Sequence, residues 1–364
     1  MPFTDFHGNT ETVTRIREML ARDRFPHAVI ISGAEGAGKY TLAQMIARTL
    51  NCLEQPQSEA LPDFCGHCSN CTRIAQADDL EARFAEALET REGMRDADKR
   101  DARILIQTHP EVIVVPPDPP QMLIKVGQVR QVIDSVFYKP VEARRKVIIF
   151  TQSKFMKEAA NSLLKILEEP PDYATLILLT TNPGELLPTI RSRCITFTLG
   201  ALPVSELGEA LARSRKELKP AQRELVARLA NGAMGRTVSF KLDDYVKARG
   251  DALTLLRSAV MGNDHSELFK VTETYRGGGE GRDKTDQLLR TLYLLLEDLL
   301  MLKSGTPELV RNTDIQGELG RLAQSVDFEW IVTASQRLAD VERGMRRNLL
   351  RSLSLDAFAT SLER

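Results

Sequence analysis

The glycine-rich stretch GAEGAGKYT, residues 33–41, is the first segment whose residue types suit a chemical role. It nearly matches the loop G-x-x-x-x-G-K-[Ser/Thr] that wraps around nucleotide phosphates. Gly33, Gly36 and Gly38 let the backbone turn tightly and point N–H groups at phosphate oxygens, and the following helix adds its N-terminal dipole. Lys39 would reach the β- and γ-phosphates. An apolar strand pattern precedes the segment and a helical pattern follows it, so the context that a phosphate loop requires is present.

The residues that should bind magnesium are missing at two places. The motif needs a Ser or Thr hydroxyl after Lys39, but Tyr40 stands there, with its hydroxyl at the far end of a ring. Thr41 comes one position late and is rotated by about 100° around the helix. In an ATPase the apolar stretch KVIIF would end in Asp-Glu, whereas Thr151 and Gln152 follow it here. We therefore predict a loop that does not hydrolyse ATP, and nucleotide binding without hydrolysis stays open.

Four of the five cysteines are clustered in the pattern C-x12-C-x2-C-x2-C. They are Cys52, Cys65, Cys68 and Cys71. The two adjoining x2 spacings let three thiolates converge on one cation, and the first cysteine completes a tetrahedron. Four thiolates fill the shell of a structural zinc and leave no position for a catalytic water. His67 is a rival ligand and an iron–sulfur cluster a rival group, but the pattern favours an all-cysteine zinc site.

The third candidate is TIRSRC, residues 189–194, in which Arg191 and Arg193 bracket a serine on a short turn or helix end. The pattern alone leaves two hypotheses open. The arginines are either solvated surface charges, or one of them is an arginine finger. Such a finger is a rigid cation offered to the γ-phosphate that a neighbouring subunit holds.

The overall charge is nearly balanced, with 49 Lys and Arg against 50 Asp and Glu. This balance argues against a chain that wraps nucleic acid over its whole surface. The sequence has no apolar run of the roughly 18 residues that would cross a bilayer. Its start, MPFTDFHGN, lacks the basic and then apolar order of a signal peptide. We expect a soluble, cytoplasmic protein.

The elements that must position these residues alternate through the first two hundred residues. Apolar strand patterns occur at HAVIISG, EVIVV, KVIIF and TLILLT, and helical spacing lies between them, as at 126–136 and 156–167. Alternating strands and helices predict an α/β fold with a parallel sheet that is covered on both faces. From about residue 202 onward Leu and Ala recur at helical spacing, so the rest of the chain is predicted to be all-α.

We predict three domains, at residues 1–200, 201–245 and 246–364. The first contains the cysteine module, 52–71, and an inserted charged segment, 78–104. Leu80, Phe84 and Leu88 give this insertion one weak apolar stripe amid alternating charges, which indicates a solvated helix or a partly disordered excursion rather than a binding element. The Gly-rich piece at 276–283 is predicted to be a mobile loop.

These motifs, in this order, resemble the delta-prime, gamma and tau subunits of the bacterial DNA polymerase III clamp loader. The matching stretches are FTDFHGN, PHAVIISGAEGAGK, the four-cysteine knuckle, THPE, FMKEAANSLLKILEEPP and TTNPGELLPTIRSRC. The resemblance covers nearly all of residues 1–200, thins through 201–245, where NGAMGR fits the family's lid domain, and returns faintly near the C-terminus. It implies an AAA+ RecA-like domain with a zinc knuckle, a small helical lid domain and a C-terminal helical collar that joins subunits in a pentameric ring.

Within this family gamma and tau hydrolyse ATP, whereas delta-prime has a degraded site and is the stationary subunit. The losses at Tyr40, Thr151 and Gln152 make the chain most similar to delta-prime, although the retained Lys39 and glycines are a departure toward gamma. The resemblance implies that Arg193 completes the ATP site of an adjacent gamma or tau subunit. It also implies zinc, the gamma/tau and delta subunits, the sliding clamp, and primed DNA bound through the assembled complex. The alternatives are an ATP-hydrolysing gamma/tau-like subunit and a zinc-stabilised AAA+ scaffold with a relic loop and no role in clamp loading.

Overall fold

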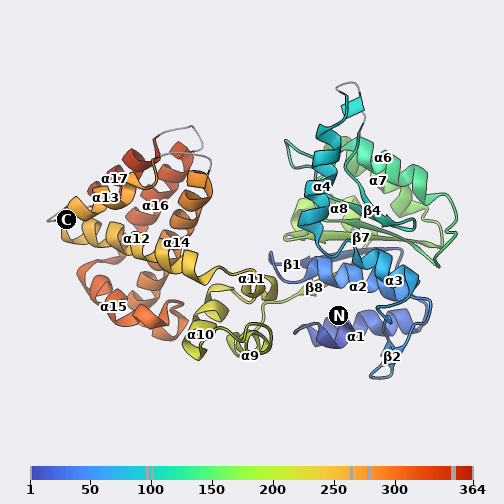
Figure 1. Ribbon diagram of the computed structural model, residues 1–364, viewed down its shortest axis with the longest axis horizontal. Coiled ribbons are helices and arrows are strands. Elements are labelled where there is room, and N and C mark those ends of the chain that lie inside the picture. The colour runs from blue at the N-terminus through green and yellow to red at the C-terminus, as the bar shows by residue number, and fades with distance from the viewer. Residues whose placement is uncertain are drawn as a thin grey trace. The chain divides into compact units, whose positions relative to one another are not determined.

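The computed structural model describes residues 2–95, 98–99, 102–262, 265–276, 280–345 and 350–362. These residues form two compact units, which Figure 1 shows in ribbon form. The first unit comprises residues 2–210 together with Asn231–Arg236. The second comprises Leu211–Ala230 together with residues 237–362. The division into three domains, with boundaries near 200 and 245, stays a prediction.

The first unit is built on a six-stranded sheet with the strand order β4-β5-β6-β7-β1-β8. The strands are β1 (Ala28–Gly33), β4 (Ile106–His109), β5 (Val112–Val115), β6 (Lys146–Phe150), β7 (Ala174–Thr180) and β8 (Ile195–Leu199). All neighbours pair in parallel except β4, which runs antiparallel to β5. In the centre, Ile30 of β1 lies between Leu178 of β7 and Thr196 of β8. Because carboxyl ends of parallel strands meet at one edge of a sheet, the segments after β1, β6 and β7 share an edge.

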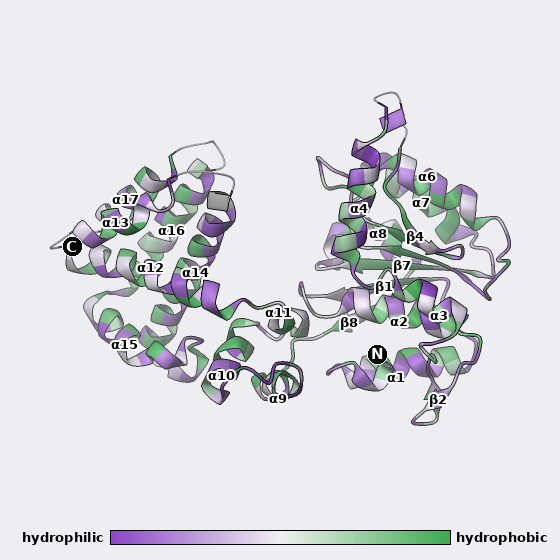
Figure 2. Ribbon diagram, in the orientation of Figure 1, coloured by the Kyte–Doolittle hydropathy of each residue, from purple (hydrophilic) through white to green (hydrophobic). Residues whose placement is uncertain are grey.

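Helices cover both faces of this sheet. Val29 and Ile31 of β1 join a core with α1 (Thr10–Ala21), α2 (Lys39–Asn51) and α3 (Ser69–Ala75). The alternate residues Ala28 and Ile30 join a second core with α6 (Val126–Val136) and α7 (Lys157–Glu168). Figure 2 shows the central strands as hydrophobic, as burial on both faces requires. The predicted α/β fold with a covered parallel sheet is confirmed.

Shorter elements complete the first unit. They are η1 (Phe3–Asp5), the hairpin of β2 (Gln57–Ser58) and β3 (Leu61–Pro62), α4 (Leu80–Glu92), η2 (Pro183–Glu185) and α8 (Pro188–Arg191). Helices α9 (Val204–Ser214) and α11 (Met234–Val238) each have residues in both units.

The inserted segment 78–104 contains an ordered helix, α4. The Asp79 side chain accepts a hydrogen bond from the Ala82 N–H at the start of this helix, as an N-cap does. Leu80 and Phe84 pack against the core that contains α2, and Arg91 forms an ion pair with the buried Asp118 at 2.7 Å. The helix is therefore attached to the first unit by its apolar stripe and by one buried charge. Residues 96, 97, 100 and 101 of the insertion lie outside the described residues.

Within its described residues, every secondary-structure element of the second unit is a helix. Its elements are α10 (Pro220–Leu229), α12 (Leu242–Met261), α13 (Ser266–Glu273), α14 (Glu280–Lys303), η3 (Pro307–Leu309), η4 (Thr313–Ile315), α15 (Gln316–Ser325), α16 (Phe328–Met345) and α17 (Arg351–Thr360). Leucines of α12 and α14 lie at the centre of its core, with Leu292, Leu295 and Leu299 fully buried. The predicted all-α part is thus confirmed.

Two further sequence expectations concern this part of the chain and its surface. Of the predicted mobile loop at 276–283, residues 277–279 lie outside the described residues, and α14 begins at Glu280. Across the described ranges, the helices are too short or too polar to span a membrane.

Candidate functional site

The predicted phosphate loop connects β1 to α2 at the carboxyl edge of the sheet. Gly36 and Gly38 have φ angles of 79° and 87°, in the left-handed region that favours glycine. A Cβ atom on Gly36 would lie 2.9 Å from the Cγ atom of Arg236, so close approach of a second segment also requires glycine there. Gly33 ends β1 and Gly38 is the N-cap of α2. The sequence prediction of a strand, a tight loop and a helix is therefore matched by the backbone.

The side chain of Lys39 folds back over its own loop. Its Nζ atom donates hydrogen bonds to the carbonyl oxygens of Gly33 at 2.8 Å and Ala34 at 2.7 Å. Burial lowers the pKa of Lys39, while the nearby carboxylate of Glu35 opposes that shift. A phosphate bound here would replace these carbonyls as the partner of the ammonium group, as the motif requires.

The Tyr40 hydroxyl is turned away from the loop and into the protein. It donates a hydrogen bond to the Ala77 carbonyl at 2.6 Å and accepts one from the Gln44 side-chain amide at 2.7 Å. Burial raises the pKa of Tyr40, so its phenol is neutral near pH 7. Thr41 is exposed on the outside of α2. In this arrangement the Tyr40 hydroxyl is bonded to the segment that follows α3 and not to the phosphate loop.

The end of β6 presents hydroxyl and amide groups in place of carboxylates. Thr151 and Gln152 are half-buried, and the buried Ser153 hydroxyl lies 2.8 Å from the Thr180 hydroxyl at the end of β7. A carboxylate does approach this edge, since Glu185 of η2 accepts a hydrogen bond from Ser153 at 3.2 Å. Sequence reasoning missed Glu185 because it inspected only the residues that follow β6, whereas this side chain comes from the segment after β7.

A second segment lies directly against the loop. The Gly235 N–H donates a hydrogen bond to the Gly36 carbonyl at 2.8 Å, and a guanidinium nitrogen of Arg236 lies 3.6 Å from a carboxylate oxygen of Glu35. Both residues belong to NGAMGR, which the sequence placed in a lid domain but not at the loop. The only signal was a glycine followed by an arginine at the end of NGAMGR, and this pattern is too common to locate a contact.

The four clustered cysteines converge on one point. Their Sγ atoms all lie within 4.8 Å of one another. Zn–S bonds of 2.3 Å in a tetrahedron place sulfurs about 3.8 Å apart, so the arrangement fits one zinc-sized ion. Backbone N–H groups of Gln55 and Cys65 donate to the Cys52 sulfur at 3.2 and 3.3 Å, which helps to hold this sulfur in place. The cluster is therefore a group that could hold a metal.

The rival ligand His67 lies at the surface. Its Nε2 atom pairs with Glu54 at 3.3 Å, and its side chain is 70% exposed. Together with Cys65 these two residues form a second group of metal-binding types. This group shares a cysteine with the four-thiol set and is largely open to solvent, so the buried four-cysteine set is the better site for a structural ion.

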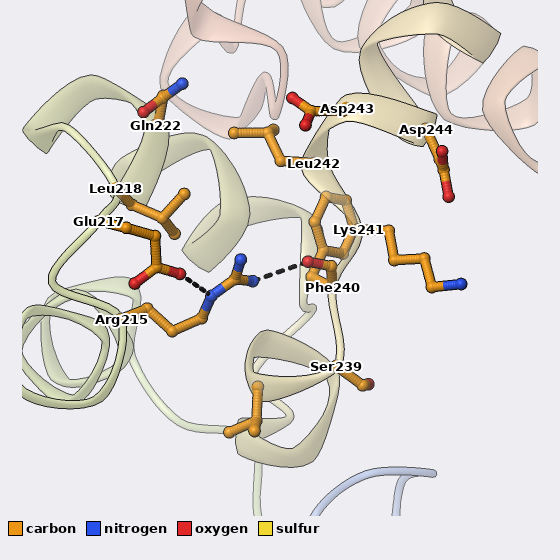
Figure 3. A pocket seen from close by; sticks show the side chains of 11 residues that line it. Arg215, Glu217, Leu218, Gln222, Ser239, Phe240, Lys241, Leu242, Asp243 and Asp244 are labelled. Carbon is orange, nitrogen blue, oxygen red and sulfur yellow. Dashed lines mark hydrogen bonds and ion pairs between the residues drawn. The ribbon is translucent and has the colours of Figure 1, made fainter.

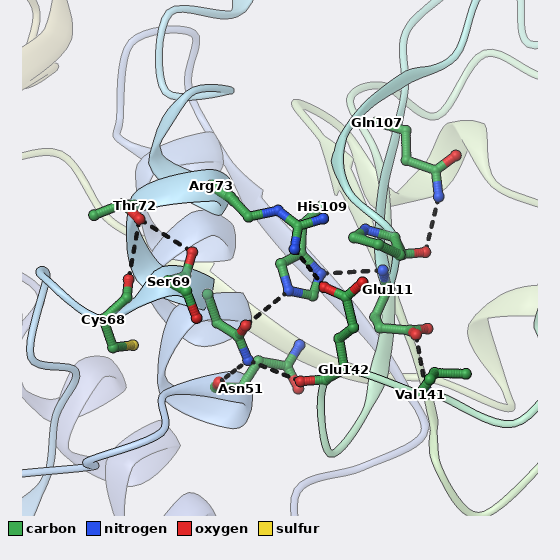
Figure 4. A network of polar contacts seen from close by, with 12 residues as sticks. Asn51, Cys68, Ser69, Thr72, Arg73, Gln107, His109, Glu111, Val141 and Glu142 are labelled. Atoms are coloured by element: carbon green, nitrogen blue, oxygen red, sulfur yellow. Dashed lines mark hydrogen bonds and ion pairs between the residues drawn. The ribbon is translucent and has the colours of Figure 1, made fainter.

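The motif THPE fastens the cysteine module to the sheet, as Figure 4 shows. His109, which is buried, contacts the side-chain oxygen of Asn70 in α3 at 3.1 Å, and its Nδ1 atom accepts the Glu111 N–H at 3.1 Å. The Asn70 amide donates to the carbonyls of Asn51 and Glu142. Burial lowers the pKa of His109, and the cation of Arg73 lowers it further. The network requires a neutral imidazole, because Nδ1 acts as an acceptor.

Arg193 follows α8 on the surface of the first unit. Its Nη2 atom pairs with Glu168 at 2.8 Å, and its Nη1 atom donates to the Thr189 carbonyl at 2.9 Å. Arg191 is also exposed. Cys194 is half-buried, and burial raises the pKa of its thiol to about 12. The guanidinium of Arg193 thus contacts the end of α7 and the turn that carries it.

A hollow in the second unit is lined by residues from the segment after α9 to the first turn of α12 (Figure 3). Its arginine, Arg215, donates to the Glu217 carboxylate at 2.8 Å and to the Phe240 carbonyl at 2.7 Å. Asp243 and Asp244 add negative charge at its rim. These acidic residues disfavour an anionic ligand, so the hollow does not resemble a phosphate site.

Comparison with known proteins identifies the family. The family model described as "DNA polymerase III, delta subunit" matches residues 8–203, more than half of the chain. The chain is 30% identical over 285 residues to DNA polymerase III subunit tau of Escherichia coli (strain K12), an alignment that covers 76% of this chain and 39% of that protein. It is 32% identical over 252 residues to subunit tau/gamma of Haemophilus influenzae, covering 68% of this chain and 31% of that protein.

The chain spans less than two fifths of the length of either relative. Among solved structures, it is similar to a DNA polymerase III gamma subunit-related protein of Thermotoga maritima, with 20% identity, a TM-score of 0.39, and coverage of 98% of this chain and 100% of that one. The structural score is too low to add to the sequence match. On the strength of the matched residues 8–203, this chain belongs to the DNA polymerase III clamp-loader family.

Proposed function

We propose that this chain is a delta-prime-like subunit of a DNA polymerase III clamp loader. In this role it is a stationary AAA+ subunit that does not hydrolyse ATP at its own loop. It supplies Arg193 to the ATP site of a neighbouring gamma or tau subunit while the complex, which also contains delta, places a sliding clamp on primed DNA. The chain then contributes to catalysis only through its neighbour's nucleotide.

One observation carries this proposal: the loop lacks the groups that bind magnesium, whereas elsewhere in the first unit an exposed arginine is held in place. At the loop, the hydroxyl that replaces the Mg²⁺ ligand is bonded to Ala77, and β6 ends without carboxylates. At the surface, Arg193 is exposed and held by Glu168 and Thr189. A chain with an impaired loop and an ordered, exposed arginine is suited to complete another subunit's site.

The remaining parts have supporting roles under this proposal. Cys52, Cys65, Cys68 and Cys71 hold one structural zinc, which stabilises the module between α2 and α4 and leaves no open position for catalysis. The phosphate loop, with Lys39 in place, binds nucleotide weakly or not at all without a metal ligand. The lid at 201–245 and the collar at 246–364 follow the family's three-domain plan, with the collar joining subunits in the ring.

The test is ATP hydrolysis by a reassembled loader that contains Arg193→Ala in this chain. Clamp- and DNA-stimulated hydrolysis at the adjoining site should fall by about 10³–10⁵-fold, the range for loss of an arginine finger. The variant Arg191→Ala, which removes an exposed arginine two positions earlier, is the matched control and should retain the rate. Unchanged hydrolysis with Arg193→Ala would contradict the proposal.

A second candidate is an ATP-hydrolysing gamma/tau-like subunit. It is favoured by the names of the relatives, by the retained Lys39, and by the approach of Glu185 to the end of β6. In that case the purified chain should turn over ATP clearly above background, and Lys39→Ala should abolish the turnover. Under our proposal both proteins stay at background.

A further inference from the structure

The guanidinium of Arg193 is fixed by three contacts before any neighbour is present. Its Nη2 atom lies 2.8 Å from Oε1 of Glu168, and its Nη1 atom donates to the Thr189 carbonyl at 2.9 Å and to the Ser192 hydroxyl at 3.4 Å. The latter two partners belong to the turn that carries the arginine, whereas Glu168 is the last residue of α7. One partner therefore comes from a separate, rigid element. A guanidinium has five N–H donors, so this arrangement leaves donors for a phosphate.

The location of Glu168 is not explained by the stability of α7. A negative side chain in the last turn faces the negative end of the helix dipole, which disfavours it. Glu169 is also acidic, and Pro170 and Pro171 end the helix without help from either carboxylate. The Glu168 and Arg193 side chains are 51% and 36% exposed, and exposed ion pairs contribute little to folding stability. The ion pair is therefore better explained by its effect on the orientation of the Arg193 side chain than by a contribution to folding stability.

From this geometry we propose that Glu168 is a positioning residue for Arg193. An unrestrained arginine samples many rotamers, and a displacement of about 1 Å at a reacting centre can reduce a rate by about 100-fold. The Glu168 carboxylate, anchored at the end of α7, holds the guanidinium in one orientation and leaves its other N–H donors for a phosphate. The inference rests on the proposed role of Arg193 as an arginine finger.

The experiment measures steady-state ATP hydrolysis by the reassembled loader with clamp and primed DNA. Glu168→Ala in this chain should lower kcat at the adjoining site by about tenfold and leave KM for ATP within about twofold, because the residue orients the finger without touching the nucleotide. Glu168→Gln keeps an oxygen that accepts from the guanidinium and should restore most of the rate. Glu169→Ala makes the same charge change one residue later and should behave as the unaltered chain.

A double-mutant cycle separates this inference from the proposed function. In a chain that already carries Arg193→Ala, Glu168→Ala should have no further effect, since the two residues act as a unit. If Arg193→Ala lowers hydrolysis while Glu168→Ala leaves it unchanged or raises it, the proposed role of Arg193 is supported and the positioning role of Glu168 is wrong. An additive effect of Glu168→Ala in the Arg193→Ala background would also overturn it. If Arg193→Ala itself has no effect, the proposed function fails first.

Discussion

The substitution Tyr40→Phe tests whether the residue that replaced the magnesium ligand has become a structural link. It removes the hydroxyl that donates to the Ala77 carbonyl at 2.6 Å and accepts from Gln44 at 2.7 Å, and leaves the ring in place. Ala77 and Gln44 are 2% and 1% exposed, so both lose a partner that water cannot readily replace. An unsatisfied buried polar group costs about 1–3 kcal/mol. With two such groups beside a half-buried ring, we expect a loss of about 2–3 kcal/mol of local stability.

Hydrogen exchange by mass spectrometry measures this loss where it should occur. Amides of α2 and of residues 69–78 should exchange about 30- to 150-fold faster, which corresponds to about 2–3 kcal/mol in the opening free energy. The only tryptophan, Trp330, is buried in the second unit, so its fluorescence unfolding transition should be unchanged and serves as an internal control. Tyr173→Phe is the matched variant, because it removes one exposed hydrogen bond to the Phe137 carbonyl. Exchange rates for Tyr40→Phe no faster than those for Tyr173→Phe would refute the reasoning.

Three further predictions concern the metal, pH and nucleotide. Purified protein should contain about one zinc per chain, and Cys68→Ser should lose it while Cys194→Ser keeps it; elemental analysis decides, and metal-free reduced protein would contradict the four-thiolate site. The pKa of His109 is lowered from 6.5 in the folded state, so the unfolded chain binds more protons, and the free energy of unfolding should be fully present above about pH 6.5 and fall as the pH drops below it. Urea unfolding at several pH values should show this slope, and His109→Gln should flatten it; an equal slope in both proteins would argue against His109 as the titrating group. The isolated chain should hydrolyse ATP at the background rate, and Lys39→Ala should leave that rate unchanged. ATP turnover that depends on Lys39 would favour the gamma/tau-like candidate.

Four of the sheet's strands, including β1 before the phosphate loop, were predictable because they are buried on both faces. The patterns HAVIISG, EVIVV, KVIIF and TLILLT became β1, β5, β6 and β7, since continuous apolar runs of this length are typical of a covered parallel sheet. Strand β8 was not predicted. Its sequence ITFTL buries only Phe197 and Leu199, as an edge strand does, and so lacks a continuous apolar run.

The side-chain partners at the site were less accessible to sequence reasoning. Spacing brought the four cysteines together correctly because thiolates at x2 intervals have few other arrangements. By contrast, the Ala77 carbonyl is an acceptor that any residue could supply, so nothing in the sequence marks it as the partner of Tyr40. The contact of Gly235 with Gly36 joins residues about two hundred positions apart through backbone atoms alone. Such contacts depend on the fold and leave no residue pattern.

The central claim is that Arg193 acts on a neighbour's nucleotide, and one reassembled loader tests it most directly. In this loader only the ATPase subunit adjoining this chain keeps a functional phosphate loop, so all measured hydrolysis comes from that single site. The account predicts that Arg193→Ala reduces clamp- and DNA-stimulated hydrolysis by about 10³–10⁵-fold while Arg191→Ala does not. Equal rates for the Arg193→Ala, Arg191→Ala and unaltered complexes would contradict it.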